Sequence, residues 1–168
     1  LEQELKRQAL TDSLTNADNR RSFMKNLERE IAVSDRYKTS LTLIAFDVVH
    51  FKQINDNYGH DIGDAVLVSL AQHVPKMLRN TDTFARIGGE EFAIILPGAN
   101  LEHGANVAKD LCSSFRDLSI SAESVHLGFT CSFGVIERVD KESSQSMLKR
   151  VDINMYLAKE QGRNSVVS

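Results

Sequence analysis

The sequence has few of the residues that mark the more specialised classes of protein. It contains no tryptophan, two prolines and two cysteines in 168 residues. Cys112 and Cys131 lie in no metal-ligand spacing, which indicates reduced core thiols rather than a disulfide framework or a zinc site. No apolar run is long enough to span a bilayer, and no signal peptide is visible. We therefore expect a cytoplasmic domain.

The chain also lacks a strong charge of either sign. Its formal net charge is −3, which argues against a nucleic-acid-binding surface, so we expect no nucleic-acid partner. Any phosphate-bearing ligand must be held locally, by a few basic groups or by a metal ion. Hydrophobic residues make up 42% and charged residues 26%, as in a soluble globular protein of one domain. The chain begins at Leu1 rather than Met, which indicates a piece of a longer protein that upstream regions could attach to a membrane.

The most informative stretch, residues 86–96, is typical of a strand, a tight turn and a second strand. Gly88 and Gly89 permit positive φ and close backbone approach, as a hairpin turn needs. Glu90 and Glu91 follow at once, and two adjacent carboxylates repel each other unless a cation or a proton shares the site. This favours Mg²⁺ that carries a phosphate. A solvated Gly-Gly hairpin with exposed glutamates is the alternative, and it is the commoner arrangement.

A second candidate site lies at the end of the apolar stretch 41–49, which predicts a buried strand. This stretch carries a single charge, Asp47. A charge there is unusual unless it is paired or binds a cation. The ends of such strands are also where α/β folds place their sites. Asp47 is therefore a candidate functional residue.

Apolar spacing and turn residues divide the rest of the chain. The first ten residues resemble the tail of a helix that continues upstream. Pro75 should bend or end its helix early, Gly128 and Gly134 are candidate bulges, and Gly162 is a candidate C-cap. Strands and helices alternate irregularly, which favours an α+β fold. We expect helices over 22–35, 50–58, 63–77, 102–118 and 141–161, and strands over 41–49, 83–87, 92–96, 125–135 and 165–167.

Several separate motifs resemble one family, the GGDEF-domain diguanylate cyclases, in the variant with Glu at the third position. The similarity runs in the family's order from about residue 10 to the end of the chain, and an ordered set of this kind is highly specific. The matching stretches are Gly88-Gly89-Glu90-Glu91-Phe92, Asp12-Ser13-Leu14-Thr15, Asn19-Arg20-Arg21, Phe51-Lys52-Gln53-Ile54-Asn55-Asp56, Gly59-His60, Gly63-Asp64, Ala158-Lys159 and Gly162-Arg163-Asn164.

The resemblance implies a fold and a reaction. The fold is an α+β, nucleotidyl-cyclase or palm-like domain with a central, mostly antiparallel sheet flanked by helices. Residues 11–168 would form the catalytic domain, and 1–10 the end of an upstream signalling helix or linker from a sensory or regulatory domain. The reaction joins two GTP molecules into cyclic di-GMP and releases two pyrophosphates. Each domain presents one GTP, so a homodimer of facing domains is needed.

The resemblance also implies the ligands and their residues. Two Mg²⁺ or Mn²⁺ ions per active site would be held by Asp47, the carbonyl of Val48 and Glu90, with Glu91 assisting. Glu90 would also accept the hydroxyl proton. Asp64 can accept both donors on the guanine edge and Asn55 can pair with another edge atom, which selects against adenine. The full expected substrate set is Phe51, Lys52, Asn55, His60, Asp64, Gly88, Gly89, Lys159 and Arg163.

Arg79 and Asp82 form an RxxD pair that resembles the family's inhibitory site, where cyclic di-GMP restrains the enzyme. An arginine fork suits guanine and phosphate alike. A surface ion pair at a helix end is the alternative for these two residues. The corresponding alternative for Lys159 and Arg163 is a basic helix end that complements the helix dipole.

One departure from the family pattern affects the metal site. The usual Asp-x-Asp at the first strand is Asp47-Val48-Val49 here, and period two puts positions 47 and 49 on the same side. Val49 therefore removes one negative charge, and we expect weaker metal affinity rather than none. Two hypotheses follow: an active cyclase, favoured by the acidic and amide residues that remain, or a catalytically weak or inactive domain that serves as a receptor for GTP or cyclic di-GMP.

Overall fold

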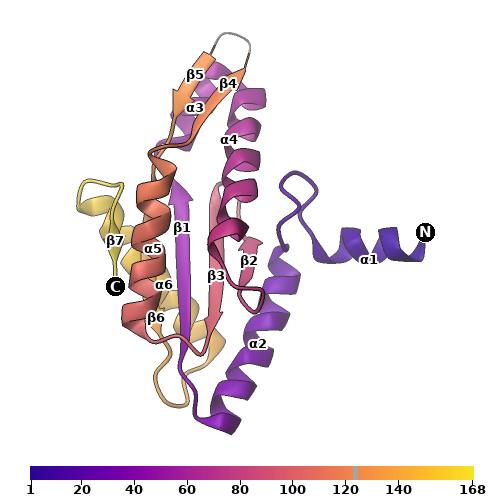
Figure 1. Ribbon diagram of the computed structural model, residues 1–168, viewed down its shortest axis with the longest axis vertical. Coiled ribbons are helices and arrows are strands. Elements are labelled where there is room, and N and C mark those ends of the chain that lie inside the picture. The colour runs from indigo at the N-terminus through magenta and orange to yellow at the C-terminus, as the bar shows by residue number, and fades with distance from the viewer. Residues whose placement is uncertain (123–124) are drawn as a thin grey trace.

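The computed structural model describes residues 1–122 and 125–168. A five-stranded sheet runs through the centre of the molecule in the order β2-β3-β1-β6-β7, and a separate two-stranded hairpin, β4-β5, lies at one end (Figure 1). The strands are β1 (Leu41–Val48), β2 (Thr83–Arg86), β3 (Glu91–Pro97), β4 (Ser119–Ala122), β5 (Val125–Gly128), β6 (Cys131–Glu137) and β7 (Val166–Val167).

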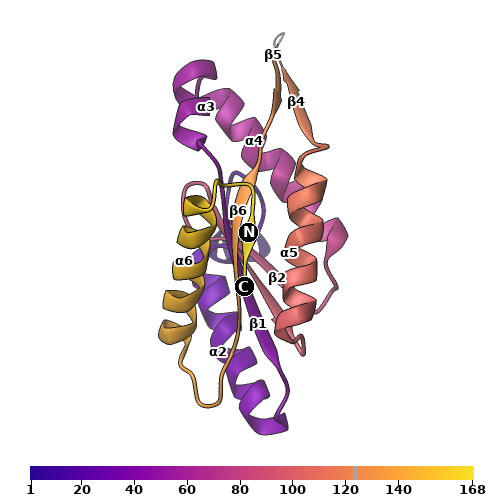
Figure 2. The ribbon, with the colours of Figure 1, turned by 90° about the vertical axis from the view of Figure 1, so that its left-hand side faces the viewer.

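Helices cover both faces of the sheet. Seen edge-on, α2 and α6 lie on one side, and α4 and α5 lie on the other (Figure 2). This arrangement confirms the predicted α+β class. The helices are α1 (Glu2–Leu10), α2 (Arg20–Tyr37), α3 (Phe51–Tyr58), α4 (His60–His73), α5 (Leu101–Phe115) and α6 (Ser144–Glu160), with a 3₁₀ turn η1 (Val74–Met77).

The central strand β1 is buried along its whole length. It pairs antiparallel with β3 on one side and with β6 on the other, and β2 continues the sheet antiparallel to β3. Among the described strands of this sheet, β7 alone is parallel to its neighbour, β6. The sheet is therefore mostly antiparallel, as predicted, and its central strand reads as a continuous apolar run because both of its faces are covered.

Period two along the strands builds two separate cores. On the α4–α5 face, Phe46 stacks on Phe133 and Phe92, with ring centroids 4.8 and 5.6 Å apart. On the α2–α6 face, Phe23 and Leu27 of α2 pack on alternate residues of β1 and β3. Three paired residues at the end of the sheet, Asp47, Glu91 and Ser132, form a polar row. Because strand neighbours alternate between faces, this polar row also belongs to the α2–α6 face.

Gly134 lets α6 approach the sheet. A Cβ at this position would lie 2.5 Å from the backbone nitrogen of Met155 and closer still to the carbonyl oxygen of Val151. The β1–β6 register runs without interruption through Gly134, and the β4–β5 register runs through Gly128. Our prediction of bulges at both glycines was therefore wrong. At Gly134 the glycine is required by the helix above the strand rather than by the strand itself.

The stretch predicted as one strand over 125–135 is two strands, β5 and β6, and β4 was not predicted. Apolar residues recur through both halves, so the pattern gave no sign of the break at Phe129 and Thr130. The helix predicted over 102–118 ends at Phe115, where Arg116, Asp117 and Leu118 bond to the third residue before them. That tightening to i→i−3 bonds closes the helix early.

Other local predictions were confirmed. The helix before Pro75 ends at His73 and continues only as the 3₁₀ turn η1. The first ten residues form the helix α1, which has no buried residue and extends away from the body of the molecule (Figure 1). Within the described part of the chain, no helix has the length and apolar character needed to cross a membrane.

A buried ion pair fixes the loop between β6 and α6. Glu142 is almost fully buried and accepts hydrogen bonds from Arg150 Nη2 at 2.6 Å, Arg150 Nε at 2.8 Å and Ser146 Oγ at 2.6 Å. The Arg150 guanidinium is the main cause that lowers the pKa of Glu142 from 4.5 to about 2. A carboxyl with a lowered folded pKa contributes stability above its unfolded pKa and loses it as the pH falls through the folded pKa.

We therefore predict that Glu142→Gln lowers the free energy of unfolding at pH 7 by about 2 kcal/mol, since a fraction of the shift is lost to solvent screening at the half-exposed Arg150. The difference between wild type and variant should shrink as the pH falls from 4.5 towards 2. Urea denaturation over this range measures it, with exposed Glu28→Gln as the control. A difference that does not change with pH would contradict the prediction.

Candidate active site

A pocket of about 240 Å³ opens where β1 ends. The chain leaves β1 through His50, which has φ 55° and ψ 36°, and then enters α3. This left-handed residue turns the start of α3 back over the strand end. The turn before β3 and the end of α6 complete the pocket. Its lining is Asp47, Val48, Val49, His50, Phe51, Lys52, Glu90, Lys159 and Arg163.

Seven of the expected site residues therefore line one pocket: Asp47, Val48, Phe51, Lys52, Glu90, Lys159 and Arg163. They come from four segments that are distant in the chain: the end of β1, the start of α3, the β2–β3 turn and the end of α6. Sequence reasoning missed His50 as a lining residue, because nothing in its neighbours indicated a left-handed conformation. Val49 lies in the pocket too, at the position where the resemblance expects a carboxylate.

Asp47 is the buried charge of the site, with 7% of its surface exposed. Its Oδ2 lies 2.5 Å from Lys159 Nζ, whereas its Oδ1 is buried and has no hydrogen-bond partner in the described part of the chain. Burial raises the pKa of Asp47, and the nearby charge of Glu90 raises it further, while Lys159 opposes the shift. One oxygen of the carboxylate thus remains in need of a donor or a cation.

The Gly88-Gly89 turn is held by Arg86. Its guanidinium donates to the carbonyl oxygens of Gly89 at 2.7 Å and Gly88 at 3.2 Å, and it also pairs with Asp12 at 3.1 Å. Neither glycine has a positive φ, so our expectation of left-handed glycines in this turn was wrong. Close approach holds at Gly88, where a Cβ would lie 3.3 Å from Cβ of Glu91.

Glu91 lies opposite Asp47 in the β1–β3 register, and side chains at paired positions share a face. Burial raises the pKa of Glu91, and the carboxylates of Asp152 and Asp47 add to the rise, whereas Lys159 and Arg20 oppose it. Arg20 lies in one of the stretches that resemble the family, but no spacing in the sequence connects Arg20 or Asp152 to Glu91. Only the folding of α2 and α6 onto the same face brings them there.

The donor set fits a hard divalent cation. Asp47, Glu90 and the carbonyl of Val48 offer oxygen ligands only, which Mg²⁺ and Mn²⁺ prefer. The unpartnered Oδ1 of Asp47 is the observation that favours a cation over a second ion pair. Among the described residues, no group of three or more His, Cys, Asp or Glu side chains is arranged to hold a metal ion. A cation here would therefore need ligands from a phosphate or from water.

The expected guanine-binding residues lie on the α3–α4 pair, outside the pocket lining. Asn55 on α3 faces Gly63 on α4 so closely that a Cβ at Gly63 would overlap Oδ1 of Asn55. That Oδ1 is buried and has no hydrogen-bond partner in the described structure. Asp64 follows Gly63, and His60 lies one turn before it; both are exposed. The fold thus brings Asn55 beside Gly63 and Asp64.

The end of α6 has an unusual backbone. Gly162, Arg163 and Asn164 all have positive φ, at 94°, 63° and 47°. The Arg163 N–H donates to the carbonyl of Ala158 at 3.2 Å, which is the closing bond of a Schellman motif. Gly162 is therefore the predicted helix terminator, one residue after the C-cap. The amide oxygen of Asn164 can accept from Arg116 Nε and Nη2, each at 3.2 Å, and this contact fixes the turn that carries Arg163.

Arg79 and Asp82 form the closed turn that precedes β2. Arg79 Nη2 lies 2.8 Å from Asp82 Oδ1, and the Arg79 N–H donates to Asp82 Oδ2 at 2.8 Å. The Asp82 carboxylate is nearly buried, whereas the Arg79 side chain is 49% exposed. Arg79 also donates to the carbonyl of Pro97 at 3.0 Å. The two residues are thus together at the surface, which agrees with either interpretation of the RxxD pair.

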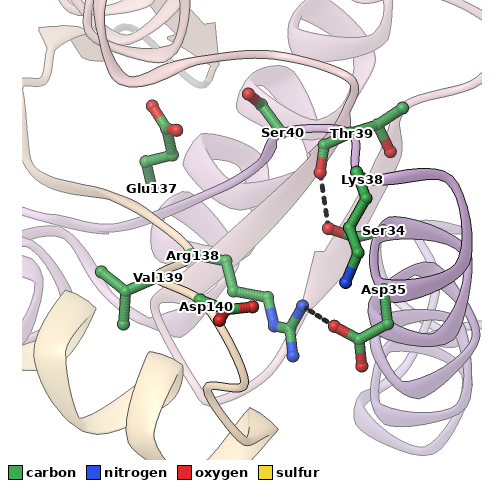
Figure 3. Close-up of a pocket in the computed structure, with 9 residues that line it drawn as sticks. All are labelled: Ser34, Asp35, Lys38, Thr39, Ser40, Glu137, Arg138, Val139 and Asp140. Carbon is green, nitrogen blue, oxygen red and sulfur yellow. Dashed lines mark hydrogen bonds and ion pairs between the residues drawn. The ribbon is translucent and has the colours of Figure 1, made fainter.

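A second pocket, of about 220 Å³, lies at the opposite end of β1 (Figure 3). Three of its charged groups, Asp35, Glu137 and Arg138, already have partners. Arg138 Nη1 lies 2.6 Å from Asp35, and Glu137 Oε1 accepts from the N–H of Leu101 at 2.6 Å. Ser34 Oγ donates to the carbonyl of Thr39 at 2.6 Å. This pocket therefore joins the end of α2 to the loop after β6, and we assign it no ligand.

Comparison with known proteins agrees with the fold and identifies the family. Residues 9–165 match the family model described as "Diguanylate cyclase, GGDEF domain". The chain belongs to this family.

The individual relatives are similar over nearly the whole chain. Diguanylate cyclase DgcP of Pseudomonas aeruginosa is 37% identical over 159 residues, which are 95% of this chain and 24% of that protein. Diguanylate cyclase VdcA of Vibrio cholerae is 36% identical over 167 residues, 97% of this chain and 48% of that protein. The chain thus spans between a quarter and a half of these relatives.

A solved structure gives the same result. The coiled coil and GGDEF domain of DgcB from Caulobacter crescentus, solved in complex with c-di-GMP, has a TM-score of 0.94 and 31% identity. The match covers 99% of this chain and 88% of that one. The predicted family and fold are confirmed.

The burial of Asp47 predicts a gain in stability when its charge is removed. The ionised carboxylate is disfavoured in the fold, since its pKa is raised and Oδ1 has no partner. We predict that Asp47→Asn raises the free energy of unfolding of the metal-free protein at pH 7.5 by about 1 kcal/mol. Urea denaturation in EDTA measures this, with exposed Asp56→Asn as the control. A variant less stable than wild type would show that the Lys159 ion pair outweighs the burial.

Proposed function

We propose that this domain is a diguanylate cyclase, which condenses two GTP molecules into cyclic di-GMP and two pyrophosphates. The observation that carries the proposal is the single pocket in which Asp47, Glu90, Lys52, Lys159 and Arg163 converge. Carboxylates and cations that line the same pocket suit a metal-bound triphosphate. Family membership supports the same reaction.

The reaction is a double nucleotidyl transfer. The 3′-oxygen of one GTP forms a bond to the α-phosphorus of the other, the bond to pyrophosphate breaks, and the hydroxyl proton leaves. The same exchange in the opposite direction closes the ring. Divalent ions, when bound, would neutralise charge on the phosphoryl group and on the leaving oxygen. Glu90, which lines the pocket near Asp47, is the residue that we propose accepts the proton.

The basic residues hold the phosphates. Lys52 lies in the first turn of α3, Lys159 in the last turn of α6, and Arg163 in the left-handed turn beyond it. In the structure Lys159 pairs with Asp47. A triphosphate and its cation would compete for both partners of this pair, with the ammonium passing to the phosphate and the carboxylate to the metal.

The α3–α4 pair provides the base specificity in this proposal. Asn55 and Asp64 would contact the guanine edge, with His60 close to the nucleotide and Phe51 packed beneath. The unpartnered Oδ1 of Asn55 supports this, because a buried amide oxygen without a donor is suited to one from a ligand. The Gly88-Gly89 turn would let the backbone approach the phosphate closely.

Two domains must meet for the ring to close, since each presents one GTP. We propose that residues 11–168 are the catalytic domain and that α1 is the end of an element that joins it to regulatory regions. A receptor domain that binds GTP or cyclic di-GMP without reacting is the second candidate, and Val49 in the pocket favours it. Incubating the protein with GTP and Mg²⁺ over a range of protein concentrations separates the two. A cyclase should form cyclic di-GMP at a rate that rises with the square of the protein concentration, and a receptor should form none.

We predict that Glu90→Gln lowers cyclic di-GMP formation at least a hundredfold, because the amide neither accepts the proton nor binds the cation as a carboxylate does. The side chain keeps its shape, so the thermal midpoint should change little. The rate is measured by chromatography of nucleotides, with Glu28→Gln on the exposed face of α2 as the matched control. Turnover equal to that of wild type would remove Glu90 from the mechanism.

We also predict that Arg79 holds product. Arg79→Ala removes the guanidinium and should weaken cyclic di-GMP binding at this site by about 1–3 kcal/mol. The initial rate of Arg79→Ala on GTP should equal that of wild type, whereas the variant should form more cyclic di-GMP than wild type at late times. Progress curves with added cyclic di-GMP test this, with exposed Arg29→Ala as the control. If wild type and Arg79→Ala were inhibited equally, the RxxD pair would be a surface ion pair only.

A further inference from the structure

Ser132 is a buried hydroxyl that has no role in the description so far. It lies on β6, directly opposite Asp47 in the β1–β6 register. Its side chain is 0% exposed, and its Oγ has no hydrogen-bond partner among the described residues. The Oδ1 atom of Asp47 is likewise buried and has no hydrogen-bond partner among the described residues. Two unpartnered polar atoms thus occupy facing positions on neighbouring strands.

The register places the two side chains within reach of each other. Directly opposed residues of an antiparallel pair share a face, with Cβ atoms about 4.5–5.5 Å apart. Staggered rotation about χ1 can therefore carry the serine oxygen to within hydrogen-bond distance of the carboxylate. A hydroxyl has one proton to donate, and an ionised carboxylate only accepts.

Ser132 is the donor that this row of the sheet offers. Glu91, on the other side of Asp47 in the row, is a carboxyl and supplies no donor when ionised. Lys159 already contacts the other oxygen, Oδ2. Its ammonium also carries a positive charge, which competes with a cation for the same carboxylate. A serine hydroxyl orients the carboxylate without neutralising it.

Packing explains why Ser132 is sealed from water. Two residues further along the same strand face, Gly134 lets the backbone of α6 come down onto β6 at Val151 and Met155. A small side chain at position 132 would fit this close approach, and alanine would meet that need without leaving a buried oxygen unpaired. The hydroxyl therefore requires a reason other than packing.

We propose that Ser132 is a positioning residue whose hydroxyl donates to Oδ1 of Asp47 and fixes that carboxylate in the orientation that binds the divalent cation. The inference rests on the proposed function, because it assumes a cation at Asp47. Val49 makes the positioning more important. With one carboxylate of the usual pair absent, the geometry of the remaining one decides how well the cation is held.

The test compares Ser132→Ala with wild type in the intact protein. Mn²⁺ binding is measured from the free-ion electron paramagnetic resonance signal, with Mn²⁺ alone and with a GTP analogue whose α,β-bridge is a methylene group. Ser132→Ala should weaken Mn²⁺ binding five- to tenfold in both arms. The urea midpoint in EDTA should change little, because the loss of the hydrogen bond to Asp47 is offset by the removal of a buried hydroxyl. Ser132→Cys has a similar shape and keeps a weak donor, so its Mn²⁺ affinity should lie between those of wild type and Ser132→Ala.

Ser34→Ala is the matched control. Ser34 is also buried, but its hydroxyl is satisfied at 2.6 Å by the carbonyl of Thr39, at the far end of the sheet. This variant should lose stability and keep its Mn²⁺ affinity. A structural role for Ser132 predicts the same pattern for Ser132→Ala, and that result would overturn the inference.

The outcomes separate the inference from the proposed function. If wild type binds Mn²⁺ and Ser132→Ala binds it equally, the positioning role fails and the cyclase proposal is untouched. If wild type binds no Mn²⁺ in either arm, the cation site fails, and the role of Ser132 fails with it. Weaker Mn²⁺ binding without loss of stability supports the inference.

Discussion

The pocket depends on a carboxylate, Asp47, placed at the end of a strand that is buried on both faces. Burial of an ionised group is unfavourable unless it gains partners. Within the described part of the chain, the ion-pair partner of this carboxylate is Lys159, which lies on a helix more than a hundred residues further along the chain. The correct packing of α6 on the sheet is therefore a condition for the site, and Gly134 permits that packing. Stability and function meet at this one helix–strand contact.

The two apolar cores supply the stability that lets the fold tolerate a buried carboxylate. Phe46, next to Asp47, is stacked among aromatic rings on one face, and aliphatic residues fill the other face below α2 and α6. Each buried apolar side chain contributes about 1.5–3 kcal/mol to the stability of the fold, so the cost of burying one carboxylate is tolerated. The polar row begins only where the strand leaves these cores. The chemistry is thus confined to the end of the sheet, while the opposite end is closed by ion pairs such as Arg138–Asp35.

Local patterns in the sequence were enough to predict the α+β class, the Gly-Gly hairpin and three candidate carboxylates, Asp47, Glu90 and Glu91. The mostly antiparallel sheet and most of the other pocket residues were predicted by the family resemblance, and His50 was not predicted. Periodicity identifies which residues are apolar, and turn residues identify where elements end. Neither carries information on which positions face each other across strands. The pairing of Ser132 with Asp47, and the approach of Arg20 and Asp152 to Glu91, follow from register and helix packing and could not be predicted locally. For the same reason Gly134 suggested a bulge, when its role is set by a helix above it. The binding roles assigned by resemblance remain predictions.

Val49 changes the electrostatics of the site in two opposing ways. Burial is the main cause that raises the pKa values of Asp47 and Glu91; the charge of Glu90 adds to the rise at Asp47, and the charges of Asp152 and Asp47 add to the rise at Glu91. A further carboxylate at position 49 would add to the repulsion between these charges in the empty pocket, so valine relieves the metal-free fold. If the proposed cation site is correct, the same change would also remove a ligand, and a cation would gain less on binding. A site with fewer charges must then rely on the orientation of those that remain, and on oxygens from the substrate phosphates. Such a domain would bind its cation mainly together with the nucleotide rather than before it.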